Sequence, residues 1–140
     1  MNFEEIKKNV LFHDGSLRDV LIQNTSRESY RELCVLLGHE KIPYEIEIDG
    51  IATDIETAIA EFDKGHERRL PLIRFFLNDI CFVAHLFSEQ EIEIDFVPND
   101  VKSAEAWLRI VDVLSKMGSY FQQRIFIYEE NVREEPLFKI

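Results

Sequence analysis

The chain is poor in glycine, and this excludes several kinds of catalytic and nucleotide-binding site. Only five glycines occur in 140 residues, and each lies where a predicted helix or strand ends. A phosphate-binding loop needs clustered glycines, because its backbone must approach the phosphate oxygens closely. No such cluster and no G-x-S-x-G motif is present. The sequence therefore argues against P-loops, dinucleotide-binding loops and the nucleophile elbow of α/β-hydrolases.

Basic residues are also scarce. The chain has 16 Lys and Arg against 27 Asp and Glu, which gives a formal net charge of −11. Such an excess of negative charge repels nucleic acids and anionic lipid surfaces and attracts basic proteins or cations. We therefore expect no nucleic acid partner and no membrane partner. A basic protein is the partner that the composition favours.

Long apolar runs and paired cysteines are missing as well. No apolar run approaches the roughly 20 residues of a membrane-spanning helix. Acidic residues follow Met1 where a signal peptide would carry basic ones. Cys34 and Cys81 lie far apart, each among apolar residues, which predicts two buried, reduced thiols. These features predict a cytoplasmic protein.

The sequence has enough apolar residues, 46%, to form one packed domain over residues 1–140. Apolar periodicity predicts the order α-β-α-β-α-β-β-β-α-β. The expected helices cover residues 3–10, 25–37, 53–64 and 98–117, and the expected strands cover 17–23, 44–49, 70–77, 80–87, 91–96 and 124–128. The C-terminal residues 136–140 either dock on this domain or fray.

Local signals predict where the helices begin and end. Capping boxes at residues 25–28 and 53–56 are expected to start two helices, and Gly38 and Gly118 to end two. Strict alternation in two strands implies a sheet with one face toward solvent. We therefore predict an α+β fold, a two-layer α/β sandwich with a mostly antiparallel sheet and helices on one face. Residues expected to face inward from the last helix are Val101, Ala104, Leu108, Val111 and Leu114, with Trp107 beside them.

One pentapeptide, Glu-Ile-Glu-Ile-Asp, occurs twice, at residues 45–49 and 91–95. Like charges directly opposite on paired strands are destabilising, so the two strands are either non-adjacent or share a cation. The carboxylates could simply be solvated, could dock a basic protein, or could hold a divalent cation, although no calcium-binding loop motif is present. The candidate partner-binding residues are Glu45, Glu47, Asp49, Glu91, Glu93 and Asp95.

The histidines do not show the spacing of metal or catalytic sites. His85 is predicted to be a core histidine, and Cys81 on the same strand face is about 13 Å away, too far to pair with it. Asp14 is expected to accept hydrogen bonds in a local turn. The sequence indicates no catalytic residue, metal or cofactor. The alternative enzyme is a small metal-dependent hydrolase that uses clustered carboxylates with His13 or His66.

The one basic cluster is Lys64, Arg68, Arg69 and Arg74. It is expected to form a solvated loop, to balance the acidic strands, or to contact an acidic partner.

Residues 13–20, together with 94–96 and 125–131, resemble small bacterial proteins that are encoded beside polymorphic toxins as immunity proteins. The resemblance implies a two-layer α/β fold and inhibition by binding, and it carries over no catalytic residue. The first hypothesis is therefore an immunity-type inhibitor that binds a basic partner, such as a nuclease toxin, through an acidic sheet face. Another alternative is a homo-oligomer that pairs through Trp107 or through residues 137–140.

Overall fold

The computed structural model describes residues 1–65 and 70–140, and within them the chain forms an α+β fold, as the sequence predicts. A short 3-10 turn, Pro98–Asp100, precedes the last helix. The helices are α1 (Phe3–Asn9), α2 (Ser29–His39), α3 (Ile55–Phe62) and α4 (Ala104–Phe121). The strands are β1 (Arg18–Gln23), β2 (Tyr44–Ile48), β3 (Ile51–Thr53), β4 (Leu72–Leu77), β5 (Ile80–His85), β6 (Glu91–Phe96), β7 (Ile125–Glu129) and β8 (Phe138–Lys139).

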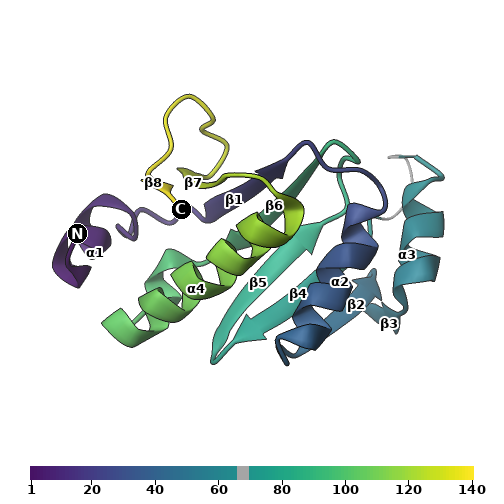
Figure 1. The fold of residues 1–140 in the computed structure, drawn as a ribbon, viewed down its shortest axis with the longest axis horizontal. Coiled ribbons are helices and arrows are strands. Elements are labelled where there is room, and N and C mark those ends of the chain that lie inside the picture. Colours follow the sequence, from purple (N-terminus) through teal and green to yellow (C-terminus); the bar gives the residue numbers. More distant parts are fainter. Residues whose placement is uncertain (66–69) are drawn as a thin grey trace.

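The strands form one sheet in the order β3-β2-β4-β5-β6-β1-β7-β8, and every neighbouring pair is antiparallel. β4, β5 and β6 form the predicted meander, and Asn78 takes a left-handed conformation (φ 56°) in its first turn. β6 and β7 both pair with β1, so α4 carries the chain from one side of β1 to the other. Helices α2, α3 and α4 lie on the same side of the sheet, and α1 lies near one of its ends (Figure 1).

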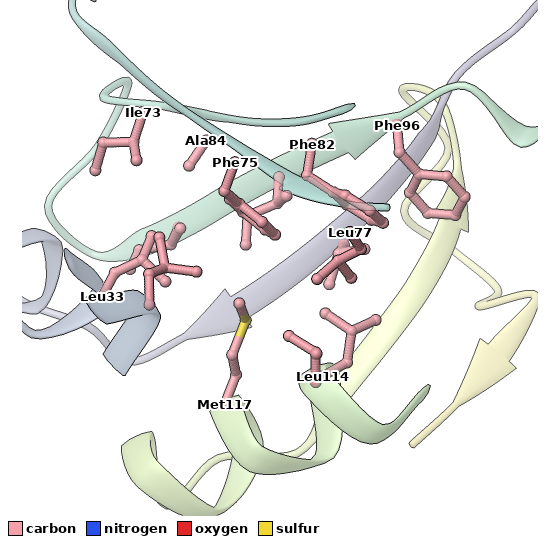
Figure 2. Packing of buried hydrophobic residues seen from close by; sticks show 14 of the residues in the cluster. Leu33, Ile73, Phe75, Leu77, Phe82, Ala84, Phe96, Leu114 and Met117 are labelled. Carbon is pink, nitrogen blue, oxygen red and sulfur yellow. The ribbon is translucent and has the colours of Figure 1, made fainter. Parts of the chain in front are cut away.

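The core lies between this helical layer and the sheet. Alternate strand residues point toward the helices, and Figure 2 shows them packed against Leu33, Leu114 and Met117. Phe82 stacks between Phe75 and Phe96, with ring centroids 5.1 and 5.0 Å away. Removing a fully buried ring of this kind costs about 3 to 5 kcal/mol, so this row anchors the middle of the sheet. Among the described residues, no helix is both long and apolar enough to cross a membrane.

The predicted start and end of α2 are wrong. Thr25 does not cap it, because its hydroxyl donates to the carbonyl of Glu89, and the residue before the helix makes no side-chain cap. The first turn is instead held by Ser29, whose hydroxyl accepts from the amide of Ser26. Gly38 lies inside the helix, which ends at His39. Beyond that end, Lys41 takes a left-handed conformation (φ 57°). In α3 the cap is Asp54, one residue later than the predicted Thr53.

Two predictions for α4 are also wrong. Ala104 and Leu108 were expected to face inward, but both are exposed, Leu108 by 64%. The buried stripe runs instead through Trp107, Ile110, Leu114 and Met117. Gly118 does not end the helix, which continues to Phe121 before Gln122 turns left-handed (φ 54°). A Cβ at Gly118 would lie 3.0 Å from the carbonyl oxygen of Gln123, so glycine lets the next segment pass close to the helix.

The sequence did not predict the short edge strands β3 and β8. β8 places the C-terminal residues beside β7, which shows that this tail docks. Phe138 packs edge-on against Trp107, with ring centroids 5.1 Å apart, and Trp107 is only 5% exposed. Trp107 and residues 137–140, which were suggested for self-association, therefore pack within the fold itself.

Candidate functional site: the helix-free face of the sheet

The strand side chains that point away from helices α2 to α4 define one side of the sheet, which we call the open face. Asp19, Leu21 and Tyr128 on this side are buried, and its other members are half-buried or exposed. Strand alternation and register place its members across β2, β4, β5, β6, β1 and β7. They are Glu45, Glu47, Leu72, Arg74, Phe76, Cys81, Val83, His85, Glu91, Glu93, Asp95, Asp19, Leu21, Phe126 and Tyr128.

One charged group lies at the β2 end of the open face. Arg74 of β4 is the register partner of Glu45, and its guanidinium lies 3.4 Å from Glu45 and 2.8 Å from Glu47. Hydrogen bonding to Glu47 raises the pKa of Arg74. We call these three residues the β2 group. Arg74 comes from the predicted basic cluster, so part of that cluster does balance an acidic strand.

Of the rest of the basic cluster, the structure describes only Lys64. Lys64 is 3.1 Å from Glu61 in an exposed pair. Arg68 and Arg69, together with His66, lie outside the described residues.

A second charged group surrounds β6. Asp19 of β1 is directly opposite Asp95, and Glu93 lies one row away on the same face. Arg133, from the segment between β7 and β8, reaches back between them, 3.0 Å from Asp19 and 2.5 Å from Glu93. The amide of Asn131 also donates to Asp19, at 3.1 Å. We call Asp19, His85, Glu93, Asp95 and Arg133 the β6 group.

The β6 group is more buried than its sequence suggests. Burial raises the pKa of Glu93, and the neighbouring charge of Asp19 raises it further. Burial by itself lowers the pKa of Arg133, but hydrogen bonding to Asp19 and the charges of both carboxylates more than offset this, so its pKa is raised. Arg133 therefore stays charged and neutralises a pair of carboxylates that would otherwise repel each other.

Asp19 and Arg133 are paired charges of the open face that sequence reasoning missed. Asp19 is only 3% exposed although it carries a charge. The available signal was an acidic residue in strand β1 directly before the apolar residues Val20, Leu21 and Ile22, because a charge in such a place demands a partner. Arg133 also lies over the ring of Tyr128, 5.8 Å from its centroid.

His85 is not the predicted core histidine. It lies half-buried on the open face, with Nε2 2.8 Å from a carboxylate oxygen of Asp95 and its ring stacked on Phe87 at 4.8 Å. Cys34 is buried as predicted, and burial raises its pKa to about 11. Cys81 is only half-buried, since it lies on the open face beside Phe76. Burial raises the pKa of Cys81, and the nearby charge of Arg74 partly offsets that effect.

An apolar strip separates the two charged groups. Leu72 and Phe76 of β4 and Val83 of β5 lie on the open face and are half-buried rather than covered. Phe87, just beyond β5, is 47% exposed. A strip of this kind is suited to exclude water against another surface, with polar groups on both sides of it.

The structure places five of the six predicted carboxylates on the open face. Glu45 and Glu47 belong to β2, and Glu91, Glu93 and Asp95 belong to β6. They form two groups instead of one, because β4 and β5 lie between those strands. The sixth, Asp49, is exposed but has left the strand, with φ 52° in the turn before β3. The first predicted solution to like-charge repulsion, non-adjacent strands, is therefore the one used, and Arg74 pairs with β2 while Arg133 pairs with β6.

The open face offers apolar and charged contacts to another surface. Among residues 1–65 and 70–140, no three His, Cys, Asp or Glu side chains gather as metal ligands. His13 is exposed in the loop after α1. Asp14 accepts from the amide and hydroxyl of Ser16, at 3.0 and 2.6 Å, so its predicted role as a local turn acceptor is confirmed. The open face can bind a complementary surface through its apolar strip and its two charged groups.

Comparisons of the chain with protein-family models, with curated proteins and with solved structures returned no match.

Proposed function

We propose that this chain is a binding protein whose open face docks a basic protein partner without catalysing a reaction on it. The observation that carries the proposal is an uncovered apolar strip between two sets of carboxylates on one sheet surface. Protein interfaces combine an apolar centre, which excludes water, with a polar rim, which sets orientation and partner choice. The open face has both parts.

The charge of the open face supports a basic partner. Six carboxylates lie on this face against Arg74, Arg124, Arg133 and Lys139. The whole chain carries a net charge of −11, so the field beyond this face has the same sign. Such a field attracts basic proteins over a distance of roughly 8 Å at physiological salt.

Two carboxylates are the best placed to meet the partner. Glu45 has a side chain that is 55% exposed, and its pair with Arg74 is long, at 3.4 Å. Glu91 lies at the outer end of β6 and forms no ion pair within the described part of the chain. Glu93 and Asp19, in contrast, are already held by Arg133. Glu45 and Glu91 are therefore assigned to partner contact, and the β6 group to holding the sheet and the segment 130–137 together.

An immunity-type inhibitor of a basic toxin is the specific form of this proposal. A nuclease presents a basic surface to the phosphates of its substrate. An acidic protein that covers this surface blocks substrate without any chemistry of its own. The resemblance described above and the excess of carboxylates on the open face both favour this form over a general adhesive role.

The test is a pull-down from the native organism at low and high salt with two charge-matched double variants. E45Q/E91Q removes two charges from the open face. E32Q/E105Q removes two charges from helices α2 and α4, on the opposite side of the sheet. We expect the wild type and E32Q/E105Q to retain the same basic protein at low salt, and E45Q/E91Q to retain much less of it.

Loss of retention at high salt is also expected, because the contribution of exposed charges is screened. Equal loss in both double variants would show that only the net charge matters and would contradict docking at the open face. Retention of no basic protein by the wild type at low salt would contradict the proposal as a whole.

A further inference from the structure

A depression beside α1 combines an apolar floor with a cationic rim. It has a volume of about 430 Å³, which is within the range of small-molecule sites. We propose that it binds a small organic anion, a carboxylate joined to a compact apolar body. This site uses neither the open face nor its carboxylates, so it is independent of the proposed function. Its lining residues are Lys7, Leu11, Phe12, His13, Pro98, Asn99, Val101 and Lys102.

The floor is made of side chains that are already packed against the core. Leu11 is 2% exposed and Val101 is 5% exposed, and Pro98 is also buried. Phe12 forms a half-buried wall. These groups cannot hydrogen-bond to water, so an apolar body placed on them gains free energy in proportion to the area that it covers.

The rim is cationic although the chain as a whole is acidic. The cations are Lys7 and Lys102, which are both exposed there, and none of the described residues that line the depression carries a carboxyl group. Lys102 donates to the side-chain oxygen of Asn99 at 3.1 Å, which holds its ammonium at the rim. Lys7 pairs with Glu4 at 3.3 Å, but both side chains are well exposed. An exposed pair of this kind contributes little, so a bound carboxylate can replace it readily.

A buried cation fixes the wall of the depression. Arg18 is 0% exposed, and its guanidinium donates to the carbonyls of Val10 (2.5 Å) and Phe12 (2.6 Å) and lies 4.2 Å from the Phe12 ring. Its one ion pair among the described residues is with Asp14, at 3.9 Å. Arginine keeps its charge even when buried. The Phe12 wall is therefore rigid and is backed by positive charge.

These features select the ligand class. Cations at the rim require an anionic group, and lysine donates several hydrogen bonds to a carboxylate. The apolar floor leaves no polar partner for a second charged group at depth. An anion with one aromatic ring or one branched alkyl group satisfies both parts, whereas inorganic phosphate uses only the rim.

The test is a titration with sodium phenylacetate followed by ¹H–¹⁵N spectra of the whole chain at low salt. We expect saturable shifts at the amides of Leu11, Phe12 and Lys102. The double variant K7M/K102M should bind at least about tenfold more weakly, since each lost charge-assisted hydrogen bond lowers affinity by roughly that factor. The matched control K8M/K64M removes the same charge from two exposed lysines outside the depression and should change the dissociation constant less than about twofold.

Two further ligands separate the parts of the proposal. Neutral phenylacetamide should bind much more weakly than phenylacetate, and inorganic phosphate should shift the same amides only at much higher concentration. The proposal is overturned by equal affinity for the amide, by equal affinity for phosphate, by an equal loss in K8M/K64M, or by the absence of saturable shifts at those amides in the wild type. None of these outcomes bears on partner binding at the open face.

Discussion

Strands β2 and β6 carry the same alternation of Glu and Ile, yet they have different surroundings. β2 lies next to the edge strand β3, and its Ile46 and Ile48 are each 7% exposed. β6 lies between β5 and β1, and its Ile92 and Ile94 are fully buried. The repeated alternation of Glu and Ile determines which side chains face the core. The position of the strand in the sheet determines how much water reaches the carboxylates on the other side.

The carboxylates of the two charged groups consequently differ in their exposure to solvent. Glu45 of β2 has a side chain that is 55% exposed, whereas Glu47 of β2 and Glu93 and Asp95 of β6 are each 18% exposed, and Asp19 on the neighbouring β1 is only 4% exposed. The final aspartate differs as well, because Asp49 turns away into the next loop whereas Asp95 stays in the strand and contacts His85. Within the β2 group, Glu45 is therefore the residue available to a partner, and the most buried charge of the β6 group, Asp19, is part of the structure.

The largest expected difference is in the stability of two arginine variants. R133M leaves Asp19 and Glu93 without their shared cation in a half-buried place, so we expect a loss of about 2 to 3 kcal/mol in the free energy of unfolding. R74M leaves Glu47 and the exposed Glu45, and we expect a loss below about 1 kcal/mol. Urea unfolding of both variants measures the difference. Equal losses would show that the two groups do not differ as described.

The next largest effect is expected in the pH dependence of the free energy of unfolding. The pKa of Glu93 is raised above its ordinary value of 4.5, so the folded chain binds a proton there more tightly than the unfolded chain does. Its charge therefore opposes folding above the raised pKa, and this penalty disappears as the pH falls toward 4.5. We expect the stability of E93Q, relative to wild type, to increase from pH 4.5 to pH 7.

A carboxylate whose pKa is lowered, Glu56, provides the control for the direction of this effect. Hydrogen bonding to Arg31 lowers the pKa of Glu56, so its charge favours folding above pH 4.5 and that contribution is lost in acid. The stability of E56Q relative to wild type should therefore fall from pH 4.5 to pH 7. If E93Q follows the same direction as E56Q in unfolding measured across this range, the described burial of Glu93 is wrong.

The smallest effect is expected at the exposed end of β2. E45Q removes a carboxylate whose contact with Arg74 is long and exposed, so the free energy of unfolding should change by less than about 0.5 kcal/mol. The melting temperature and urea midpoint measure this change. A loss comparable to that of R133M would show that Glu45 is structural and cannot be assigned to the partner.

The fold class and most strands could be predicted because their signals are local. Alternation placed Glu45 and Glu93 on a face away from the core, and the apolar runs on either side of Asn78 predicted β4 and β5. Helix ends were predicted less well. Thr25 was a plausible cap by sequence, but its hydroxyl bonds to the distant carbonyl of Glu89. In that case a tertiary contact replaced the local one.

The candidate site depended on contacts that no local pattern contains. Asp19 and Arg133 are separated by more than a hundred residues and meet only because β1 lies between β6 and β7. His85 looked like a core residue because its strand is apolar on both faces. Its place on the open face follows from the register with Asp95 and Glu93, which the sequence does not reveal.

Methyl NMR of the chain with the basic protein that it retains tests the central claim most directly. Leu72 and Val83 report on the open face, and the exposed Val35 (62%) and Leu108 (64%) report on the helical side. We predict that binding shifts the Leu72 and Val83 signals and leaves those of Val35 and Leu108 unchanged. Shifts confined to Val35 and Leu108 would contradict the account, because the partner would then bind the helices instead of the sheet.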